Sequence, residues 1–379
     1  MQKREGEGLK MKSKNLFFII FICFYLCLFF LLGEFVIRIF KPEYTFYGRF
    51  HIISDFWPRG LFSDSDILPC KLNPGRYHVQ HKKNNVDMWI NINSLGYRGK
   101  PFSLQNRENN IRILFIGSSV TFGFGIEDNQ TMPALLEETL KKKLNPKIEV
   151  INAGFQGYTS LSHYVYLRNF GVNLHPQIVI LEVSIDGDLT DLFNHRIKSK
   201  DARGRPTKVY DKYKVVDGFR VHRDYNKWLF KIPMLKHSQF YYFLMARVIA
   251  PLYDRICYAK DTNKKILNIN DLVDEWYKYI NYIRELCDDN SIKLIVVTSG
   301  TQVFLEGKFS EEHKKMTSKL RENNIEFIDV ALYLSDLNLK HGELWFPYDG
   351  HPSPFALKKS VEFMAGHIIN SIGQEYKNK

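Results

Sequence analysis

The sequence predicts an α/β protein, a three-layer α/β/α sandwich with a central parallel sheet, preceded by one transmembrane helix. Two observations predict this architecture. Residues 16–32 form an unbroken apolar run that is long enough to cross a bilayer. Beyond residue 105, short apolar segments alternate with longer segments whose apolar residues recur at helical spacing. Such an alternation is typical of a parallel sheet that helices cover on both faces.

The predicted strands are short and mostly apolar, as buried parallel strands are. We place them at residues 113–116, 148–151, 177–183, 292–297 and 325–330. Residues 132–144 are predicted as a helix, because leucines recur at helical spacing and lysines cluster near the end, where a helix C-terminus favours them. Residues 271–287 form a second amphipathic helix. A final helix begins after Ser353, which suits an N-cap, with Pro354 in its first turn.

The apolar run is interpreted as an uncleaved membrane anchor. It is long for the apolar core of a signal peptide, and no small-x-small cleavage site follows it. Basic residues are more frequent before the run than after it: Lys3, Arg4, Lys10, Lys12 and Lys14 against Arg38, Lys41 and Arg49. By the positive-inside tendency, we expect the N-terminus in the cytoplasm and the remainder of the chain outside it.

The strand at residues 113–116 is followed by a glycine-rich segment, Gly117-Ser118-Ser119-Val120-Thr121-Phe122-Gly123-Phe124-Gly125. Gly117 lets the chain turn sharply. Ser119 then lies just beyond the carboxyl end of a parallel strand, where open α/β sheets bind ligands. A serine hydroxyl is a poor nucleophile until a neighbouring base takes its proton. Ser119 is therefore a candidate nucleophile that needs a basic partner.

The C-terminal region offers that partner in the segment Asp349-Gly350-His351-Pro352. An imidazole has a pKa near neutrality, and an adjacent carboxylate can fix its tautomer and stabilise the imidazolium. Each segment alone is more often ordinary turn chemistry, because serine, aspartate and glycine all favour turns. Together they predict Ser119 as nucleophile, Asp349 as orienting acid and His351 as general base, in that chain order.

The glycine-rich segment does not fit a nucleotide site. No Gly-Lys-Ser or Gly-Lys-Thr follows it, as a phosphate-binding loop requires. A dinucleotide fingerprint would lack its third glycine, since Gly125 is followed by Ile126, Glu127 and Asp128. We expect no metal and no organic cofactor, because acyl transfer through a serine needs neither.

Three segments resemble the sequence blocks of the SGNH (GDSL-type) hydrolases, a family of esterases and acyltransferases, in a membrane-anchored bacterial branch. They are residues 117–123, residues 150–160 and residues 349–354. Upstream, Asn93-Ser94-Leu95-Gly96-Tyr97-Arg98-Gly99 is similar to a segment that often precedes the nucleophile block in anchored members. The resemblance extends over about residues 85–373.

The resemblance implies a flavodoxin-like sheet and an acyl-serine formed at Ser119, with the backbone N–H groups of Ser119 and Gly157 as the oxyanion hole. Asp349 lies two residues before His351, a spacing that the resemblance links to polysaccharide acetyl transfer. The implied function is a serine esterase or O-acyltransferase for O-acetyl groups of surface or exported polysaccharide, at the bacterial inner membrane, periplasm or cell surface. Two alternatives stay open: a lipase or lysophospholipase-like esterase, and a non-catalytic membrane-anchored glycan-binding relative.

Two positions depart from the family pattern. Ser118 stands where the nucleophile block usually has an acid. No asparagine follows the strand at residues 177–183, where the family supplies an oxyanion donor; depending on register, Asp186 or Gly187 fills that position. Losing one such donor typically costs about a hundredfold to a thousandfold in turnover, and an ionised aspartate would also repel the oxyanion. We therefore expect a weak or specialised enzyme, unless an apolar site keeps Asp186 protonated.

The predicted organisation has a basic cytoplasmic N-terminus at residues 1–14, an anchor at 15–40, a juxtamembrane segment at 41–105 and a catalytic domain at 106–373. An insertion at residues 195–265 concentrates basic and aromatic side chains. We interpret it as a lid, a glycan-facing surface or a solvated excursion with one amphipathic helix.

The formal charge of +12 fits anionic lipid or acidic glycan better than nucleic acid, because no nucleic-acid motif accompanies it. Of the five cysteines, Cys70, Cys257 and Cys287 lie beyond the anchor. Their spacing fits neither a disulfide framework nor a zinc motif, and one bridge among them stays open.

Overall fold

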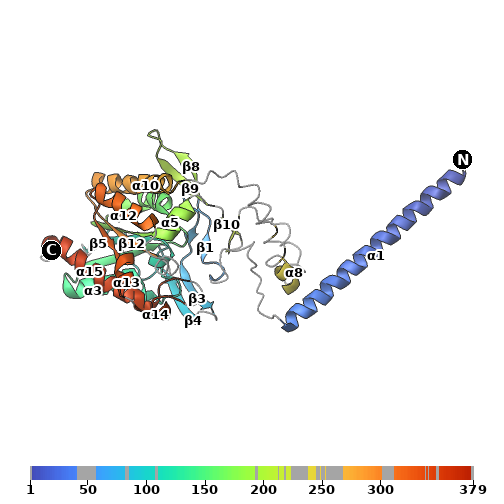
Figure 1. The fold of residues 1–379 in the computed structure, drawn as a ribbon, viewed down its shortest axis with the longest axis horizontal. Helices are drawn as coiled ribbons and strands as arrows, with labels where there is room; N and C mark the ends of the chain where they lie inside the picture. Colours follow the sequence, from blue (N-terminus) through green and yellow to red (C-terminus); the bar gives the residue numbers. More distant parts are fainter. Residues whose placement is uncertain are drawn as a thin grey trace. The chain divides into compact units, whose positions relative to one another are not determined.

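The computed structural model describes residues 2–40, 57–81, 85–106, 110–192, 195–211, 213–216, 219–222, 238–244, 248, 252, 268–300, 311–337, 339, 341–346 and 350–376. The chain divides into two compact units, and each is described by itself. The larger unit is Phe56–Arg220 with Lys265–Lys379, and the smaller is Met1–Asp55 with Val221–Lys264. Figure 1 follows the chain through both units.

The larger unit is built on a five-stranded sheet with the order β13-β12-β7-β5-β6, in which every neighbouring pair is parallel. The strands are β5 (Ile111–Gly117), β6 (Ile148–Gly154), β7 (Ile178–Ser184), β12 (Lys293–Ser299) and β13 (Phe327–Asp329). Counted along the chain, this order is 2-1-3-4-5, the flavodoxin-like arrangement, whose switch point lies between β5 and β7. The predicted parallel sheet is confirmed, and each predicted strand overlaps an observed one.

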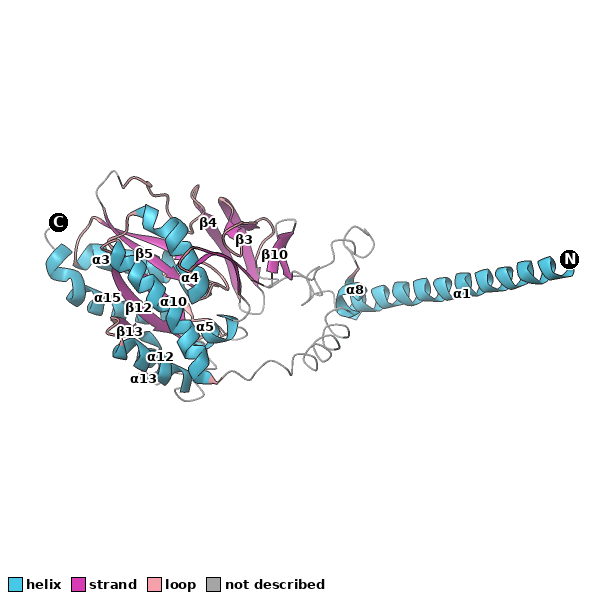
Figure 2. Cartoon of the chain, turned by 90° about the horizontal axis from the view of Figure 1, so that it is seen from above, coloured by secondary structure: helices cyan, strands magenta, loops and turns pink. Residues whose placement is uncertain are grey.

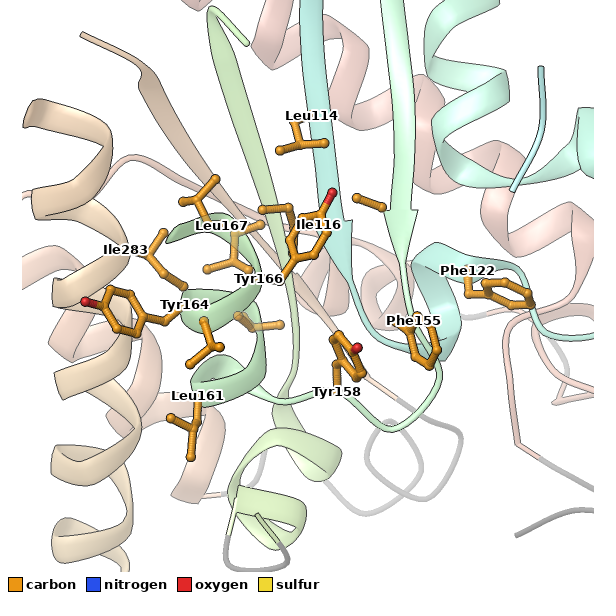
Figure 3. Packing of buried hydrophobic residues seen from close by; sticks show 14 of the residues in the cluster. Leu114, Ile116, Phe122, Phe155, Tyr158, Leu161, Tyr164, Tyr166, Leu167 and Ile283 are labelled. Atoms are coloured by element: carbon orange, nitrogen blue, oxygen red, sulfur yellow. The ribbon is translucent and has the colours of Figure 1, made fainter. Parts of the chain in front are cut away.

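Helices cover both faces of the sheet (Figure 2). One layer contains α3 (Met132–Lys143), α13 (Val330–Asp336) and α15 (Pro354–Tyr376). The other contains α4 (Ser160–Tyr166), α10 (Ile269–Asp289) and α12 (Glu311–Glu322). Figure 3 shows this second core, where Tyr164 of α4 lies beside α10 and its Ile283. The predicted three-layer sandwich is therefore confirmed.

The strands are mostly apolar because both faces of the sheet are covered. Ile113 and Phe115 of β5 pack in the layer of α3 and α15, whereas Leu114 and Ile116 pack in the layer of α4 and α10. All four side chains are fully buried. Successive side chains of a strand point to opposite faces, so a strand covered on both sides cannot alternate apolar with polar residues.

The last helix begins as its sequence predicts. The Ser353 hydroxyl accepts a hydrogen bond from the Ala356 N–H at 3.2 Å, and Pro354 is the first residue of α15. The α10 helix is capped in the same way, because the Asn268 side chain accepts from the Asn270 N–H at 3.1 Å. These caps fix where both helices start.

Shorter elements surround the sandwich. Before β5 lie β1 (Phe62–Ser63) paired with β2 (Lys71–Leu72), and β3 (Gly75–His81) paired with β4 (Val86–Ile92), both antiparallel. After β7 come α5 (Ile185–Leu192) and two strand pairs, β8 (Arg196–Lys200) with β9 (Pro206–Tyr210) and β10 (Tyr213–Val216) with β11 (Phe219–His222). The remaining turns are α2 (Ser119–Phe122), α14 (His341–Leu344), the 3₁₀ turns η2 (Asp128–Gln130) and η4 (Val172–Leu174), and the π turn η3 (Leu167–Gly171).

The smaller unit contains α1 (Gln2–Phe40) and α8 (Gln239–Leu244). The predicted apolar helix is present: Leu16–Phe40 is helical and strongly apolar, and its apolar stretch is not buried. By length and composition, this helix can cross a membrane.

Cys70 and Cys287 are buried free thiols, so the two do not form the bridge that the sequence left open. Burial raises the pKa of both thiols to about 12. Cys257 lies outside the described residues.

Candidate active site

The segment after β5 turns sharply and places Ser119 at the start of a short helix. The strand ends at Gly117, and α2 begins at Ser119 with Ser118 as its N-cap. A Cβ atom added at Gly117 would lie 2.1 Å from Thr121 Oγ1 and 2.5 Å from Glu182 Oε2, so only glycine fits there. The turn lies at the carboxyl end of β5, where open α/β sheets bind ligands.

His351 reaches Ser119 on a loop that precedes α15. Its Nε2 atom lies 2.7 Å from Ser119 Oγ. An antiparallel bridge between Trp345 and Pro352 holds the loop, together with a hydrogen bond from the Phe346 N–H to the His351 carbonyl at 2.9 Å. When the imidazole proton is on Nδ1, the Ser119 hydroxyl donates to Nε2, which is the geometry that general-base activation requires.

The imidazole of His351 is also held on its flat side. The ring of Phe124 stacks on it with centroids 4.2 Å apart and an interplanar angle of 17°. Trp57 in turn meets the rings of Phe122 and Phe124 in T-shaped contacts at 5.2 and 5.5 Å. Trp57 belongs to the segment predicted as juxtamembrane, and part of that segment therefore packs on the candidate site.

A buried carboxylate holds the turn that carries Ser119. Glu182, fully buried on β7, accepts hydrogen bonds from the Ser118 N–H at 2.8 Å, the Ser118 hydroxyl at 3.2 Å and the Thr121 hydroxyl at 3.1 Å. Its other oxygen accepts from the Ser299 hydroxyl. A buried carboxylate is tolerated when donors satisfy it in this way. Ser118, which departs from the family pattern, thus binds an acid that a neighbouring strand supplies.

Arg98 holds the backbone that follows α2. Its buried guanidinium donates to three main-chain carbonyl oxygens, those of Phe122, Gly123 and Ile126. Its Nε atom donates to the Asp128 carboxylate at 2.7 Å. The last carbonyls of a helix lack intrahelical partners, and here one cation satisfies several of them. Arg98 therefore fixes the path of the loop that carries Phe124.

Gly157, the second predicted oxyanion donor, follows β6 in a turn with a φ of +73°. A Cβ atom at this position would lie 3.2 Å from the Arg220 guanidinium. Arg220 is buried, donates to the Gln156 carbonyl at 2.7 Å and forms an ion pair with buried Asp211. The structure therefore places a positive charge beside Gly157.

Asp188 joins α5 to the N-terminus of α4. Its two carboxylate oxygens accept from the N–H groups of Ser160 and Ser184, each at 3.0 Å. Burial, followed by the nearby charge of Glu182, raises the pKa of Asp188 well above its usual range. Asp188 is thus a buried carboxyl group that links the end of β7 to the start of α4.

Part of the predicted site lies outside the described residues, and Asp349 belongs to that part. Asp186 and Gly187, the two candidates for the missing asparagine position, both lie in α5, but the Asp186 side chain is not described. Within the described ranges, no group of three or more His, Cys, Asp or Glu residues could hold a metal ion.

Sequence reasoning missed the residues around Ser119 and His351, which are Trp57, Arg98, Phe124 and Glu182, and it missed Arg220 beside Gly157. One signal was present for Glu182, which is the single charged residue in the strand predicted at 177–183. A charge inside a buried strand implies hydrogen-bond donors around it.

No family model matches the sequence, and no curated protein matches it. The similar solved structures are GDSL-type lipolytic enzymes and esterases. A GDSL-like lipase from Bacteroides thetaiotaomicron is 13% identical, with a TM-score of 0.37 over 72% of this chain and 92% of that one. An acetylxylan esterase from Geobacillus stearothermophilus is 16% identical, with a TM-score of 0.38 over 70% and 95% of the two chains. The lipase/acylhydrolase from Enterococcus faecalis is 11% identical, with a TM-score of 0.38 over 71% of this chain and 98% of that one.

Proposed function

We propose that this chain is a membrane-anchored serine esterase or O-acyltransferase of the SGNH type. The observation that carries the proposal is the distance of 2.7 Å between His351 Nε2 and Ser119 Oγ, which lie 232 residues apart in sequence. A serine and a histidine at hydrogen-bond distance, at the carboxyl end of a parallel strand, suit nucleophilic acyl transfer. Asp349 is proposed as the acid that orients the imidazole.

In the proposed reaction, His351 Nε2 takes the proton of Ser119 as Oγ attacks the carbonyl carbon of an ester. The backbone N–H groups of Ser119 and Gly157 donate to the oxyanion that forms. The bond to the alcohol breaks as the imidazolium returns its proton to the leaving oxygen, and an acyl-serine remains. Water or a sugar hydroxyl then attacks while His351 takes its proton, and the acid or the new ester leaves.

The charge of Arg220 supports this assignment of the oxyanion site. A cation beside Gly157 favours negative charge there, and the ion pair with Asp211 weakens but does not remove that effect. With no asparagine donor at the end of β7, the expected turnover is low.

The proposed substrates are O-acetyl groups of surface or exported polysaccharide, and the alternative is a lipid ester. The proposed topology has α1 in a bacterial membrane, its N-terminus in the cytoplasm and the larger unit outside. The basic N-terminal flank supports this orientation. A C-terminal alkaline phosphatase fusion, which is active only outside the cytoplasm, tests it; an inactive fusion that is stably expressed would reverse the orientation.

The enzymatic proposal is tested with the full chain in detergent and 4-nitrophenyl esters of increasing acyl length. We expect hydrolysis by the unaltered protein, with acetate preferred over long chains, and a loss of about a thousandfold or more in Ser119→Ala and His351→Ala. His367→Ala and Ser318→Ala, both on helices of the larger unit, are the matched controls and should keep full activity.

Equal rates in all five proteins would exclude ester hydrolysis at this site and leave the non-catalytic alternative. A preference for long acyl chains would favour the lipase alternative. Covalent labelling of Ser119 by a fluorophosphonate gives a second readout that needs no turnover, and Asp349→Asn should slow it.

A further inference from the structure

The short helix α8 lies against the C-terminal part of α1 within the smaller unit. The ring of Phe240 meets Phe29 and Phe30 in T-shaped contacts at 5.4 and 5.3 Å. It covers Gly33 so closely that a Cβ atom there would lie 2.6 Å from the Phe240 ring. Phe240 is itself 7% exposed. The absence of a side chain at Gly33 therefore creates the place where α8 docks.

Glu34 completes the contact. Its carboxylate accepts hydrogen bonds from the Ser238 hydroxyl at 2.7 Å and from the N–H groups of Gln239 and Phe240 at 3.0 and 2.9 Å. It also accepts from Arg38 Nε at 2.7 Å. A carboxylate on an apolar helix is costly unless donors satisfy it, and the first N–H groups of a helix need acceptors. The contact gives the Glu34 carboxylate its donors and gives the first N–H groups of α8 an acceptor.

The sequence around α8 has the composition of a segment at a membrane surface. From Phe240 to Tyr253 the only charged residue is Arg247. A run of this length is too short to span a bilayer but suits an interfacial element. Val248 and Leu252 expose 41% and 52% of their surface. Basic residues flank the run on both sides: Lys231 and Lys236 before it, Arg255 and Lys260 after it.

We propose that Ser238–Leu244, with Val248 and Leu252, is a second membrane-contacting element that lies in the lipid interface beside the end of α1. The partner is the bilayer, whose acyl chains contact the exposed aliphatic side chains of Val248 and Leu252. The inference rests on the proposed anchor, because α8 docks on that helix.

The test places a nitroxide label in the full chain, reconstituted in phosphatidylcholine and phosphatidylglycerol vesicles. Single cysteines are introduced by Val248→Cys and Leu252→Cys after Cys23, Cys27 and Cys257 are replaced by alanine; Cys70 and Cys287 are buried. Collisions with oxygen, which concentrates in lipid, are compared with collisions with a water-soluble nickel chelate. We expect oxygen to dominate at both positions.

Two control labels distinguish a failure of the proposed second membrane contact from a failure of the proposed anchor. Leu26→Cys in α1 should favour oxygen, and Lys198→Cys, exposed on β8, should favour nickel. If the labels at positions 248 and 252 favour nickel, as the label at 198 should, while the label at 26 favours oxygen, the second membrane contact is wrong. The membrane anchor is then still supported. If position 26 also favours nickel, the anchor itself is wrong.

A further variant tests the docking contact. Gly33→Leu places a side chain where the Phe240 ring lies, so the label at position 252 should lose its preference for oxygen. Leu31→Val, at a position of α1 that is 64% exposed, is the control and should change nothing. An unchanged oxygen preference in Gly33→Leu would overturn the docking on α1.

Discussion

The imidazole of His351 lies against the ring of Phe124, with centroids 4.2 Å apart and planes inclined by 17°. This stack fixes the plane of the imidazole ring that contacts Ser119. The loop that carries Phe124 is in turn fixed by Arg98. Orientation of the proposed base thus depends on a residue that lies before the sheet in sequence.

Replacing Phe124 by leucine removes the stack and keeps an apolar side chain. An aromatic pair contributes about 0.5–1.5 kcal/mol beyond area burial, so we expect kcat for ester hydrolysis to fall roughly twofold to tenfold with little change in KM. Phe363→Leu on α15 breaks a similar stack, with Tyr333 of α13 at 4.2 Å, and should leave kcat unchanged. An equal loss of kcat in both variants would mean that only general stability had been tested.

The same stack has a signature that needs no activity. Because the imidazole of His351 stacks on the ring of Phe124, its Cε1 proton should resonate upfield in the proton NMR spectrum. We expect it to move downfield in Phe124→Leu but not in Phe363→Leu.

Removal of the Arg98 guanidinium should destabilise the larger unit. Arg98→Met leaves the carbonyls of Phe122, Gly123 and Ile126 without their donor, and one such buried group costs about 1–3 kcal/mol. We expect Arg98→Met to lower the free energy of unfolding, measured with urea, by at least about 2 kcal/mol. Arg205→Met removes a partly exposed ion pair with Glu285, and should cost at most about 1 kcal/mol. A similar loss of stability in the two variants would contradict the proposed role of Arg98 in holding these three carbonyls.

The fold could be predicted from the sequence because its signals are local. Every residue of 113–116 and five of the seven residues of 177–183 are apolar, and lysines mark the end of α3. Ser119 and His351 could be paired because each lies in a segment with recognisable chemistry. Arg98 could not, because its acceptors are main-chain carbonyls 24 to 28 residues away, and a carbonyl leaves no sequence signature.

The packing partners of His351 could not be predicted either. Phe124 lies in the glycine-rich segment beside several other apolar residues, and nothing local distinguishes the ring that meets the imidazole from those that fill the core. The docking of α8 on α1 depends on Gly33 and Glu34, which read in sequence only as an interruption of the apolar run.

Glu182 should matter through its acceptor oxygens more than through its charge. In Glu182→Gln, the amide oxygen can still accept from Ser118 and Thr121 while the amide nitrogen donates to the Ser299 hydroxyl. We expect fluorophosphonate labelling of Ser119 within about threefold of the unaltered rate, since neutral acceptors are weaker but present. In Glu182→Met, the buried Ser118 N–H loses its partner, and labelling should fall by more than about tenfold. Equal labelling rates for the two variants would show that the acceptor is dispensable.

His163 should make the stability of the larger unit depend on pH. It is fully buried on α4, and burial, followed by the nearby His195, lowers its pKa to about 3. The folded state thus keeps His163 neutral, whereas the unfolded state binds a proton near pH 6.5. Stability from this residue is complete above about pH 6.5 and falls as pH decreases toward 3, with a slope of up to about 1.4 kcal/mol per pH unit.

His163→Leu should therefore flatten the decline of the urea midpoint between pH 6.5 and 4, because it removes the proton uptake on unfolding. His367→Leu, which changes an exposed histidine on α15, should retain the decline of the unaltered protein. The urea midpoints are compared at several pH values between 6.5 and 4. The slope m should stay constant, so that a change in the midpoint reports a change in stability. A parallel decline in all three proteins would mean that other groups carry the acid sensitivity and that His163 is protonated in the folded state.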